Sequence, residues 1–421
     1  MDRRVPMVDL AMGLSNTVDL GHPAFLDHHK RVAFVAYFLG RELGMSPARA
    51  AWLLMAGLLH DLGALRVRER LDLMEFEAGM TGGRDDHAEL GYQFLQRYAP
   101  LEPLASTIRW HHLPWEERPA RLDSGDDVPT AANVLFIADR IAVLIDDDRP
   151  ILTQVDGIRE AMGAYRGTLF DPETLGAFES LSQREYFWFE LTDRSLYDNL
   201  LQLGAPVAVE LDGEDLAGLG RLLCDVVDFK SHYTATHSSG VAASARSLAV
   251  VRGMDGDDVT RVEVAATLHD IGKLSVPDAV LEKPGSLDEA EFGVIKGHAY
   301  HTHKLLSGIE ALEDIEPLAS RHHERLDGSG YPFRHEGEAL PEGARVIAVA
   351  DVFTALAEER PYRGPMDLDD AMDLLHEMAA QSVLDPDVVD TLTRHLGDVD
   401  EARRDGQNGA ATRYRRLLTA T

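Results

Sequence analysis

The chain has 421 residues, 45% of them hydrophobic, which is enough for about two to four domains with substantial cores and excludes a disordered protein. Its formal net charge of −31, from 72 acidic and 41 basic residues, argues against a nucleic-acid or anionic-membrane surface, since both would be repelled. The single cysteine, Cys224, excludes an internal disulfide and fits a reducing compartment.

The sequence shows neither a secretory signal nor a membrane span, so we expect a cytoplasmic protein. Residues 1–24 read as a leader whose apolar run is too short for a secretory signal. No stretch approaches the roughly 18 consecutive apolar residues that a membrane span requires.

The apolar periodicity is helical through almost the whole chain, which predicts an all-α fold. One predicted helix starts at Asp27 and closes at Gly44, and the next begins after Ser46-Pro47 and ends in His60-Asp61. In the second half, a similar helix ends in His269-Asp270. The apolar run RVIAVAD, which precedes Val352, resembles a strand but is predicted to be a buried helix because its neighbours are helical.

The two halves repeat one spacing of histidines and aspartates. His28 and His60 are 32 positions apart, as are His237 and His269. His60 and His87 are 27 positions apart, and His269 and His298 are 29 apart. The next interval is 24 positions in both halves, from His87 to His111 and from His298 to His322. The sequence therefore predicts a tandem duplication of one helical module.

In the second half, this pattern supplies a set of imidazoles and carboxylates without a thiolate. Such ligands suit iron, manganese or zinc at a hydrolytic centre. The adjacent His-Asp pair can serve two ions, because a carboxylate can bridge them, so we expect a dinuclear site. Its candidate ligands are His237, His269, Asp270, His298, His322, His323 and Asp351.

The second half resembles the HD-GYP phosphodiesterases of the HD phosphohydrolase superfamily. The resemblance covers about residues 225–396 and rests on LHDIGKLSVPDAVLEKPGSLDEAEFGVIKGH, HHERLDGSGYP and VADVFTALAEERPYR, in order and at near-identical spacing. It implies an all-helical fold that hydrolyses cyclic dinucleotides, chiefly cyclic di-GMP and in some members 3',3'-cGAMP. It also implies two or three metal ions, often iron or manganese.

Carried over position by position, the seven candidate ligands fall on the family's metal ligands. Lys273 falls on the lysine of the HDxGK motif and Tyr331 on the tyrosine of GYP, while Arg360 and Arg363 fall on basic substrate-contacting positions. Members with three metals carry a glutamate where this chain has Tyr233, so the resemblance favours two ions.

Asp270 and Lys273 are the predicted catalytic residues. We expect Asp270 to bridge two ions that hold an attacking hydroxide between them. Lys273 is expected to meet the scissile phosphate or protonate the departing ribose oxygen, the alternative being a salt bridge to a nearby carboxylate. Tyr331 would stack on a base or fix its loop, and Arg360 with Arg363 would clamp a phosphate or a guanine edge.

The first half holds an equivalent set but lacks the accessory residues. Ala64 stands where the second half has Lys273, and HHLPWEERPA replaces the GYP loop. This set is therefore either a vestigial pocket with hydrogen-bonded histidines or a second metal site, regulatory or hydrolytic. Its members are His28, His60, Asp61, His87, His111, His112 and Asp139.

The sequence thus predicts an N-terminal HD module at residues 1–200, without a GYP loop, and a C-terminal HD-GYP catalytic module at residues 201–421. The predicted function is hydrolysis of a cyclic dinucleotide, with cyclic di-GMP favoured over 3',3'-cGAMP, to a linear dinucleotide or mononucleotide. The alternatives are a general HD phosphohydrolase and a non-catalytic cyclic-dinucleotide-binding signalling protein. The expected cofactors are two divalent ions, iron or manganese before zinc or nickel. Partners beyond the substrate, including a second copy of the chain, stay open.

Overall fold

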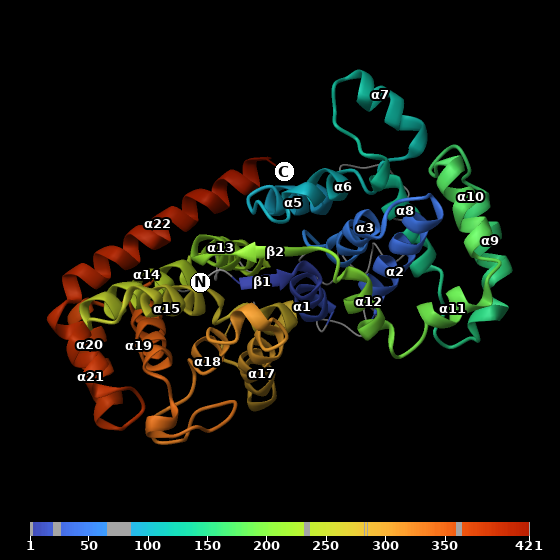
Figure 1. The fold of residues 1–421 in the computed structure, drawn as a ribbon. Helices are drawn as coiled ribbons and strands as arrows, with labels where there is room; N and C mark the ends of the chain where they lie inside the picture. Colours follow the sequence, from blue (N-terminus) through green and yellow to red (C-terminus); the bar gives the residue numbers. More distant parts are fainter. Residues whose placement is uncertain are drawn as a thin grey trace. The chain divides into compact units, whose positions relative to one another are not determined.

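The computed structural model describes residues 3–19, 27–64, 86–230, 236–281, 283, 285–358 and 364–420. The chain divides into two compact units, Arg4–Glu210 and Leu211–Ala420. Each is built almost wholly from helices (Figure 1), so the predicted all-α fold is confirmed.

The N-terminal unit is a helical bundle whose first and last segments pair as a two-stranded sheet, β1 with β2. Its elements are β1 (Arg3–Pro6), α1 (Met7–Asp19), α2 (His28–Glu42), α3 (Pro47–Leu59), α5 (Asp86–Leu95), α6 (Ala105–Arg109), α7 (Arg118–Asp123), α8 (Thr130–Val143), α9 (Val155–Gly163), α10 (Pro172–Leu181), α11 (Glu185–Leu191), α12 (Leu196–Gly204) and β2 (Ala208–Leu211).

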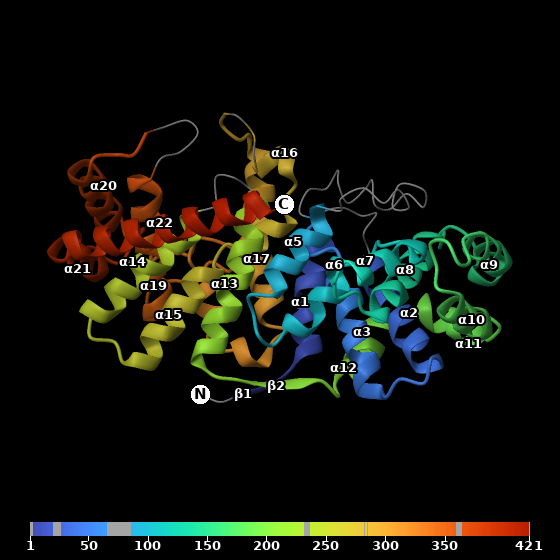
Figure 2. The same ribbon diagram turned by 90° about the horizontal axis from the view of Figure 1, so that it is seen from above.

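The C-terminal unit is a second bundle, in which α14 packs against α15, α19 and the long final helix α22 (Figures 1 and 2). Its elements are α13 (Gly213–Lys230), α14 (His237–Val251), α15 (Gly256–Leu268), the 3-10 helix η6 (Ile271–Ser275), α16 (Asp278–Leu281), α17 (Glu289–Leu306), α18 (Glu316–Ala319), α19 (Glu342–Ala357), α20 (Leu368–Ala380), α21 (Pro386–Arg394) and α22 (Leu396–Ala420).

Local sequence signals set where these helices begin. The Ser46 hydroxyl accepts a hydrogen bond from the Arg49 amide at the start of α3, and Asp255 does the same for the Asp258 amide at α15. Asp288 and Glu291 form a reciprocal capping box at α17. Each cap satisfies an amide that the first helical turn leaves unpaired.

The first two ligand-bearing helices have the same lengths in both bundles. The helices α2 and α14 both have 15 residues, and α3 and α15 both have 13. In each unit the first of these helices packs against the second and against a later buried helix, α8 or α19. The run RVIAVAD lies in α19, as predicted, and its apolar residues are buried.

None of the helices in the described part of the chain combines the length and the apolar character that a bilayer crossing requires.

Candidate metal centres

In the C-terminal unit, the candidate ligands lie within or next to six different elements. His237 is the first residue of α14, His269 directly follows α15, and Asp270 precedes η6. His298 lies in α17 and Asp351 in α19, while the pair His322-His323 follows α18. The structure brings all seven predicted ligands into one cluster.

These ligands form two groups, with Asp270 between them. The ligand atoms of His237, His269 and Asp351 lie within 4.8 Å of one another, and so do those of His298, His322 and His323. The Asp270 Oδ2 atom is 3.2 Å from His269 Nε2, and its Oδ1 atom is 3.4 Å from His298 Nε2. One carboxylate oxygen therefore faces each group, which is the geometry of a bridging ligand.

Backbone carbonyls fix how three of these imidazoles point. The Nδ1 atoms of His269, His298 and His322 lie 2.7, 2.6 and 2.7 Å from the carbonyl oxygens of Ala266, Ile295 and Ala319. A carbonyl only accepts, so each Nδ1 carries the proton and the Nε2 lone pair faces the cluster. The buried Nε2 atom of His269 has no hydrogen-bond partner, so this donor set fits a cation.

Burial keeps most of these rings neutral. It lowers the pKa of His298 to about 3 and that of His323 to about 4, and it holds the pKa of His322 well below its ordinary value. Burial alone would raise the pKa of Asp270, but His269, Lys273 and His298 together outweigh it and lower that pKa. Neutral imidazoles around ionised carboxylates are the forms that bind divalent metals.

A glycine allows α17 to approach the His-Asp segment closely. A Cβ atom on Gly272 would lie 2.0 Å from the His298 carbonyl oxygen, which no side chain tolerates. The N-terminal unit repeats the feature, because a Cβ on Gly63 would lie 2.1 Å from the His87 carbonyl oxygen. In both units, this contact places a ligand histidine beside the His-Asp pair.

Lys273, the second predicted catalytic residue, and Tyr331 of the GYP loop contact members of the C-terminal cluster. Lys273 Nζ is 2.5 Å from Asp270 Oδ2, and its side chain is 19% exposed. The Tyr331 ring packs on the ring of His323, with centroids 4.8 Å apart. Glu324 stabilises the loop that contains Tyr331. Its buried carboxylate accepts hydrogen bonds from the amides of Phe333, Arg334 and His335.

Sequence reasoning missed Glu358. Its Oε1 atom is 3.0 Å from His237 Nδ1, and its Oε2 atom accepts a hydrogen bond from Gln407 of α22 at 3.0 Å. Burial alone would lower the pKa of His237, but Glu358 and Asp351 outweigh it and raise that pKa to about 9. Glu358 therefore orients a candidate ligand from the side that faces away from the cluster.

Three residues of the sequence prediction, Tyr233, Arg360 and Arg363, lie outside the residues that the structure describes.

The N-terminal unit assembles an equivalent cluster from α2, α3, α5, α8 and the segment after α6. His28 Nε2 is 3.4 Å from Asp139 Oδ1, and His87 Nε2 is 3.5 Å from Asp61 Oδ1. The ligand atoms of His28, His60 and Asp139 form one compact group, and those of Asp61, His87, His111 and His112 form another. The structure thus brings all seven predicted N-terminal residues together as well.

Two residues that the sequence analysis passed over join this cluster. His29 Nε2 lies 4.0 Å from Asp61 Oδ2, and its ligand atom groups with those of His60 and Asp61. The guanidinium of Arg140 is buried and contacts Asp139 Oδ2 at 2.6 Å. Both had a signal in the sequence: His29 doubles a histidine, and Arg140 is the charged residue after Asp139 in an otherwise apolar run.

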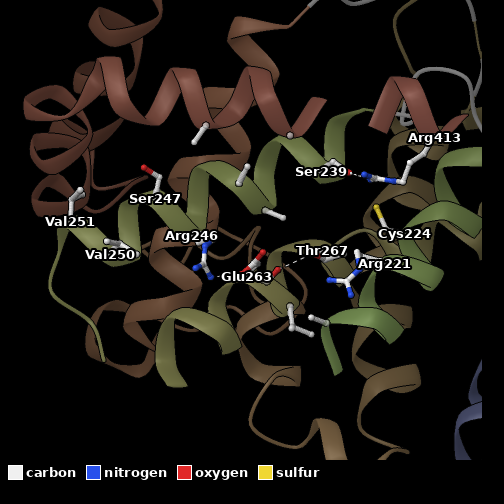
Figure 3. Close-up of a pocket in the computed structure, with 16 residues that line it drawn as sticks. Arg221, Cys224, Ser239, Arg246, Ser247, Val250, Val251, Glu263, Thr267 and Arg413 are labelled. Carbon is white, nitrogen blue, oxygen red and sulfur yellow. Dashed lines mark hydrogen bonds and ion pairs between the residues drawn. The ribbon is translucent and has the colours of Figure 1, made fainter. Parts of the chain in front are cut away.

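A separate cavity of about 400 Å³ lies in the C-terminal unit among α13, α14, α15 and α22 (Figure 3). None of the seven candidate ligands lines it. Two of its arginines are already paired, Arg246 with Glu263 at 2.6 Å and Arg413 with the Ser239 hydroxyl at 3.1 Å. The cavity is therefore distinct from the metal cluster.

Comparison with known proteins agrees with this architecture. Residues 25–144 and residues 215–388 each match the HD domain family, which confirms the predicted duplication. The chain is 31% identical to 3'3'-cGAMP-specific phosphodiesterase 1 of Vibrio cholerae over 378 residues, covering 88% of this chain and 87% of that protein.

Two further similarities are shorter or more distant. The chain is 38% identical over 194 residues to the cyclic di-GMP phosphodiesterase response regulator RpfG of Xanthomonas campestris, covering 46% of this chain and 50% of that protein. A crystal structure of a cyclic GMP-AMP-specific phosphodiesterase of V. cholerae (V-cGAP3) matches with a TM-score of 0.62 at 23% identity, covering 94% of this chain and 98% of that one. The chain contains two HD domains and is 31% identical to a phosphodiesterase of V. cholerae over 88% of its own length. It therefore belongs to the HD-GYP family of HD-domain phosphodiesterases.

Proposed function

We propose that the C-terminal unit hydrolyses a cyclic dinucleotide in a metal-dependent reaction at the Asp270 cluster. The observation that carries the proposal is the position of Asp270, whose two oxygens face two separate groups of ligands. The relatives support the substrate class, since their names specify 3'3'-cGAMP or cyclic di-GMP. Iron or manganese is the proposed metal, because imidazole and carboxylate ligands without thiolate suit both.

In this proposal, each of the two ligand groups would hold one divalent ion, and Asp270 would contribute one carboxylate oxygen to each group. Such a pair of cations supplies an activated water near neutral pH and neutralises charge on the phosphate. Five of the seven ligands are buried, and the carbonyl-bonded Nδ1 atoms keep the Nε2 atoms of His269, His298 and His322 directed inward.

Lys273 is the proposed contact to the substrate. Its ammonium group contacts Asp270 and its side chain is partly exposed, so it could contact both the cluster and an arriving phosphate. There it stabilises charge as the phosphodiester opens, or donates the proton that the departing ribose oxygen needs. Tyr331 is proposed to hold the ring of His323 in place and to border the substrate. Contacts of Arg360 and Arg363 with the substrate stay a prediction.

The test is product analysis with the full chain. Protein loaded anaerobically with Fe²⁺ or Mn²⁺ is incubated in parallel with cyclic di-GMP, 3'3'-cGAMP, a linear dinucleotide and a simple phosphate monoester. We expect a linear product from one or both cyclic dinucleotides, with no turnover by Asp270→Ala. The exposed Asp373→Ala in the same unit serves as the matched control.

Each alternative function has its own outcome in this experiment. Preferential turnover of the monoester would favour a general phosphohydrolase. Tight binding of a cyclic dinucleotide without turnover, in protein with verified metal content, would favour a non-catalytic signalling protein.

Two predictions are not decided by this experiment. Cys224 favours a reducing compartment, so a cytoplasmic location stays a prediction. Association with a second copy or another protein also stays a prediction.

A further inference from the structure

The N-terminal cluster gathers buried polar atoms that lack hydrogen-bond partners. All of them belong to its candidate ligands. They are His28 Nδ1, His60 Nε2, Asp61 Oδ1, His87 Nε2, His111 Nε2 and Asp139 Oδ1. Buried polar groups are normally satisfied, so their concentration at one place indicates a missing ligand.

The orientation of the rings makes that ligand a cation. His60 Nδ1 lies 2.8 Å from the Gly57 carbonyl oxygen and His111 Nδ1 lies 2.6 Å from that of Ile108. Both Nδ1 atoms must donate, which leaves Nε2 lone pairs directed at the carboxylate of Asp61. Lone pairs facing carboxylate oxygens repel each other unless a positive ion lies between them.

This donor set differs from that of the C-terminal unit. His29 adds an imidazole within the same 4.8 Å grouping as His60 and Asp61, whereas Ser238 follows His237 at the equivalent place. The additional imidazole beside the His-Asp pair is therefore a feature of the N-terminal unit that the C-terminal unit does not share.

The cationic side chain next to the N-terminal cluster, Arg140, is buried beside Asp139. Both Arg140 Nη2 and Nε contact Asp139 Oδ2, at 2.6 and 3.1 Å, which leaves the Oδ1 atom for the cluster. The C-terminal unit has Val352 at this place, and its cation, Lys273, occupies a partly exposed position instead. Arg140 thus orients a ligand and is too deeply buried, at 1% exposed, to reach a phosphate.

The N-terminal cluster is also more enclosed. Each of its eight candidate ligands, His29 included, is buried. In the C-terminal cluster, His323 and Asp351 are partly exposed. Structural metal sites are closed by protein ligands, whereas catalytic sites keep a side open to substrate.

We propose that the N-terminal unit is a closed, non-hydrolytic metal centre that binds a divalent transition ion through imidazoles and carboxylates, with His29 as a ligand and Arg140 as its internal counter-cation. The ion stabilises this unit, since a ligand that binds only the folded state shifts unfolding by mass action. The proposal does not depend on the function proposed for the C-terminal unit.

The test uses the full chain with the C-terminal centre disabled. Asp270→Ala protein is loaded with Mn²⁺ or Fe²⁺ and desalted, and its metal content is measured by mass spectrometry. We expect it to retain at least one ion per chain and to unfold at lower temperature after chelation. Adding His111→Ala should remove most of that metal and abolish the effect of the chelator. Adding the exposed His376→Ala, the matched control, should do neither.

A milder variant keeps the test informative if His111→Ala fails to fold. We expect His29→Ala, in the Asp270→Ala background, to fold and to bind the metal at least about tenfold more weakly. Absence of metal from Asp270→Ala, or full retention of metal after His111→Ala, would overturn the metal centre. Unchanged affinity in His29→Ala would overturn the role of His29. Cleavage of a cyclic dinucleotide by metal-loaded Asp270→Ala, lost on adding His111→Ala, would overturn the non-hydrolytic assignment.

Discussion

The N-terminal and C-terminal clusters share one ligand frame and differ in where each places its positive side chain. In the C-terminal unit, Lys273 contacts Asp270 from a partly exposed position. In the N-terminal unit, Ala64 replaces that lysine, and the buried Arg140 contacts Asp139 from inside. Both units therefore contain the candidate ligands, whereas the lysine proposed to contact the substrate is present only in the C-terminal unit. The comparison teaches that a complete set of ligands and a complete active site are separate properties.

The largest expected effect is on kcat, when Lys273 of the C-terminal unit is replaced by alanine, the residue that the N-terminal unit has at the equivalent position, Ala64. Lys273→Ala should lower kcat by about 10²–10³-fold, because a charge that stabilises the transition state is lost. Metal content should stay at the wild-type level. Steady-state kinetics and metal analysis check both, with the exposed Lys304→Ala as control. Wild-type kcat in Lys273→Ala would mean that the lysine is not what separates the two units.

Gly272 and Gly63 occupy equivalent positions, where each lies against the backbone of a ligand histidine, His298 or His87. Substitutions there test whether both clusters depend on this close contact. Gly272→Ala and Gly63→Ala should each lower the free energy of unfolding by about 1–3 kcal/mol or more, because the new Cβ collides with a backbone carbonyl. Gly293→Ala, with nothing within 4 Å of its Cβ, should instead stabilise α17 by about 0.4–1 kcal/mol. Denaturant unfolding measures all three. Equal stability of Gly272→Ala and Gly293→Ala would contradict the close approach.

Glu358 orients a single candidate ligand of the C-terminal unit, His237. Glu358→Gln keeps the size of the side chain but removes the charge that faces His237 Nδ1. Metal affinity of the C-terminal unit should fall by about 10–100-fold, the usual effect of losing a residue that orients a metal ligand. Titration of metal into chelated protein measures it, and Glu377→Gln, exposed on α20, is the control. An unchanged affinity would mean that Glu358 only fills space.

The smallest expected effect is on the pH dependence of metal binding. In metal-free protein the pKa of His237 is about 9, so near neutral pH this ring is protonated and must lose a proton to become a ligand. Affinity should therefore rise with pH by up to about tenfold per unit and level off above about pH 9. Glu358→Gln lowers the pKa of His237 and should flatten the curve. A flat curve in the wild type would show that His237 is not a ligand.

Much of this protein follows from its sequence by itself. Helical periodicity predicted the all-α fold, and the repeated interval of 32 positions between histidines predicted the duplication. The motifs around His269-Asp270 and His322-His323 pointed to the family and to the ligands that the structure gathers. These inferences succeed because spacing along a chain of helices controls which side chains share a face.

The tertiary structure decided which distant side chains complete each cluster. Glu358 reaches His237 across 121 positions and is held by Gln407 across another 49, and no local pattern encodes either contact. His29 and Arg140 were visible as residues, but only packing turned one toward Asp61 and enclosed the other beside Asp139. Local periodicity selects the face of a helix, whereas the opposing helix that covers that face is selected by burial and close packing of the whole unit.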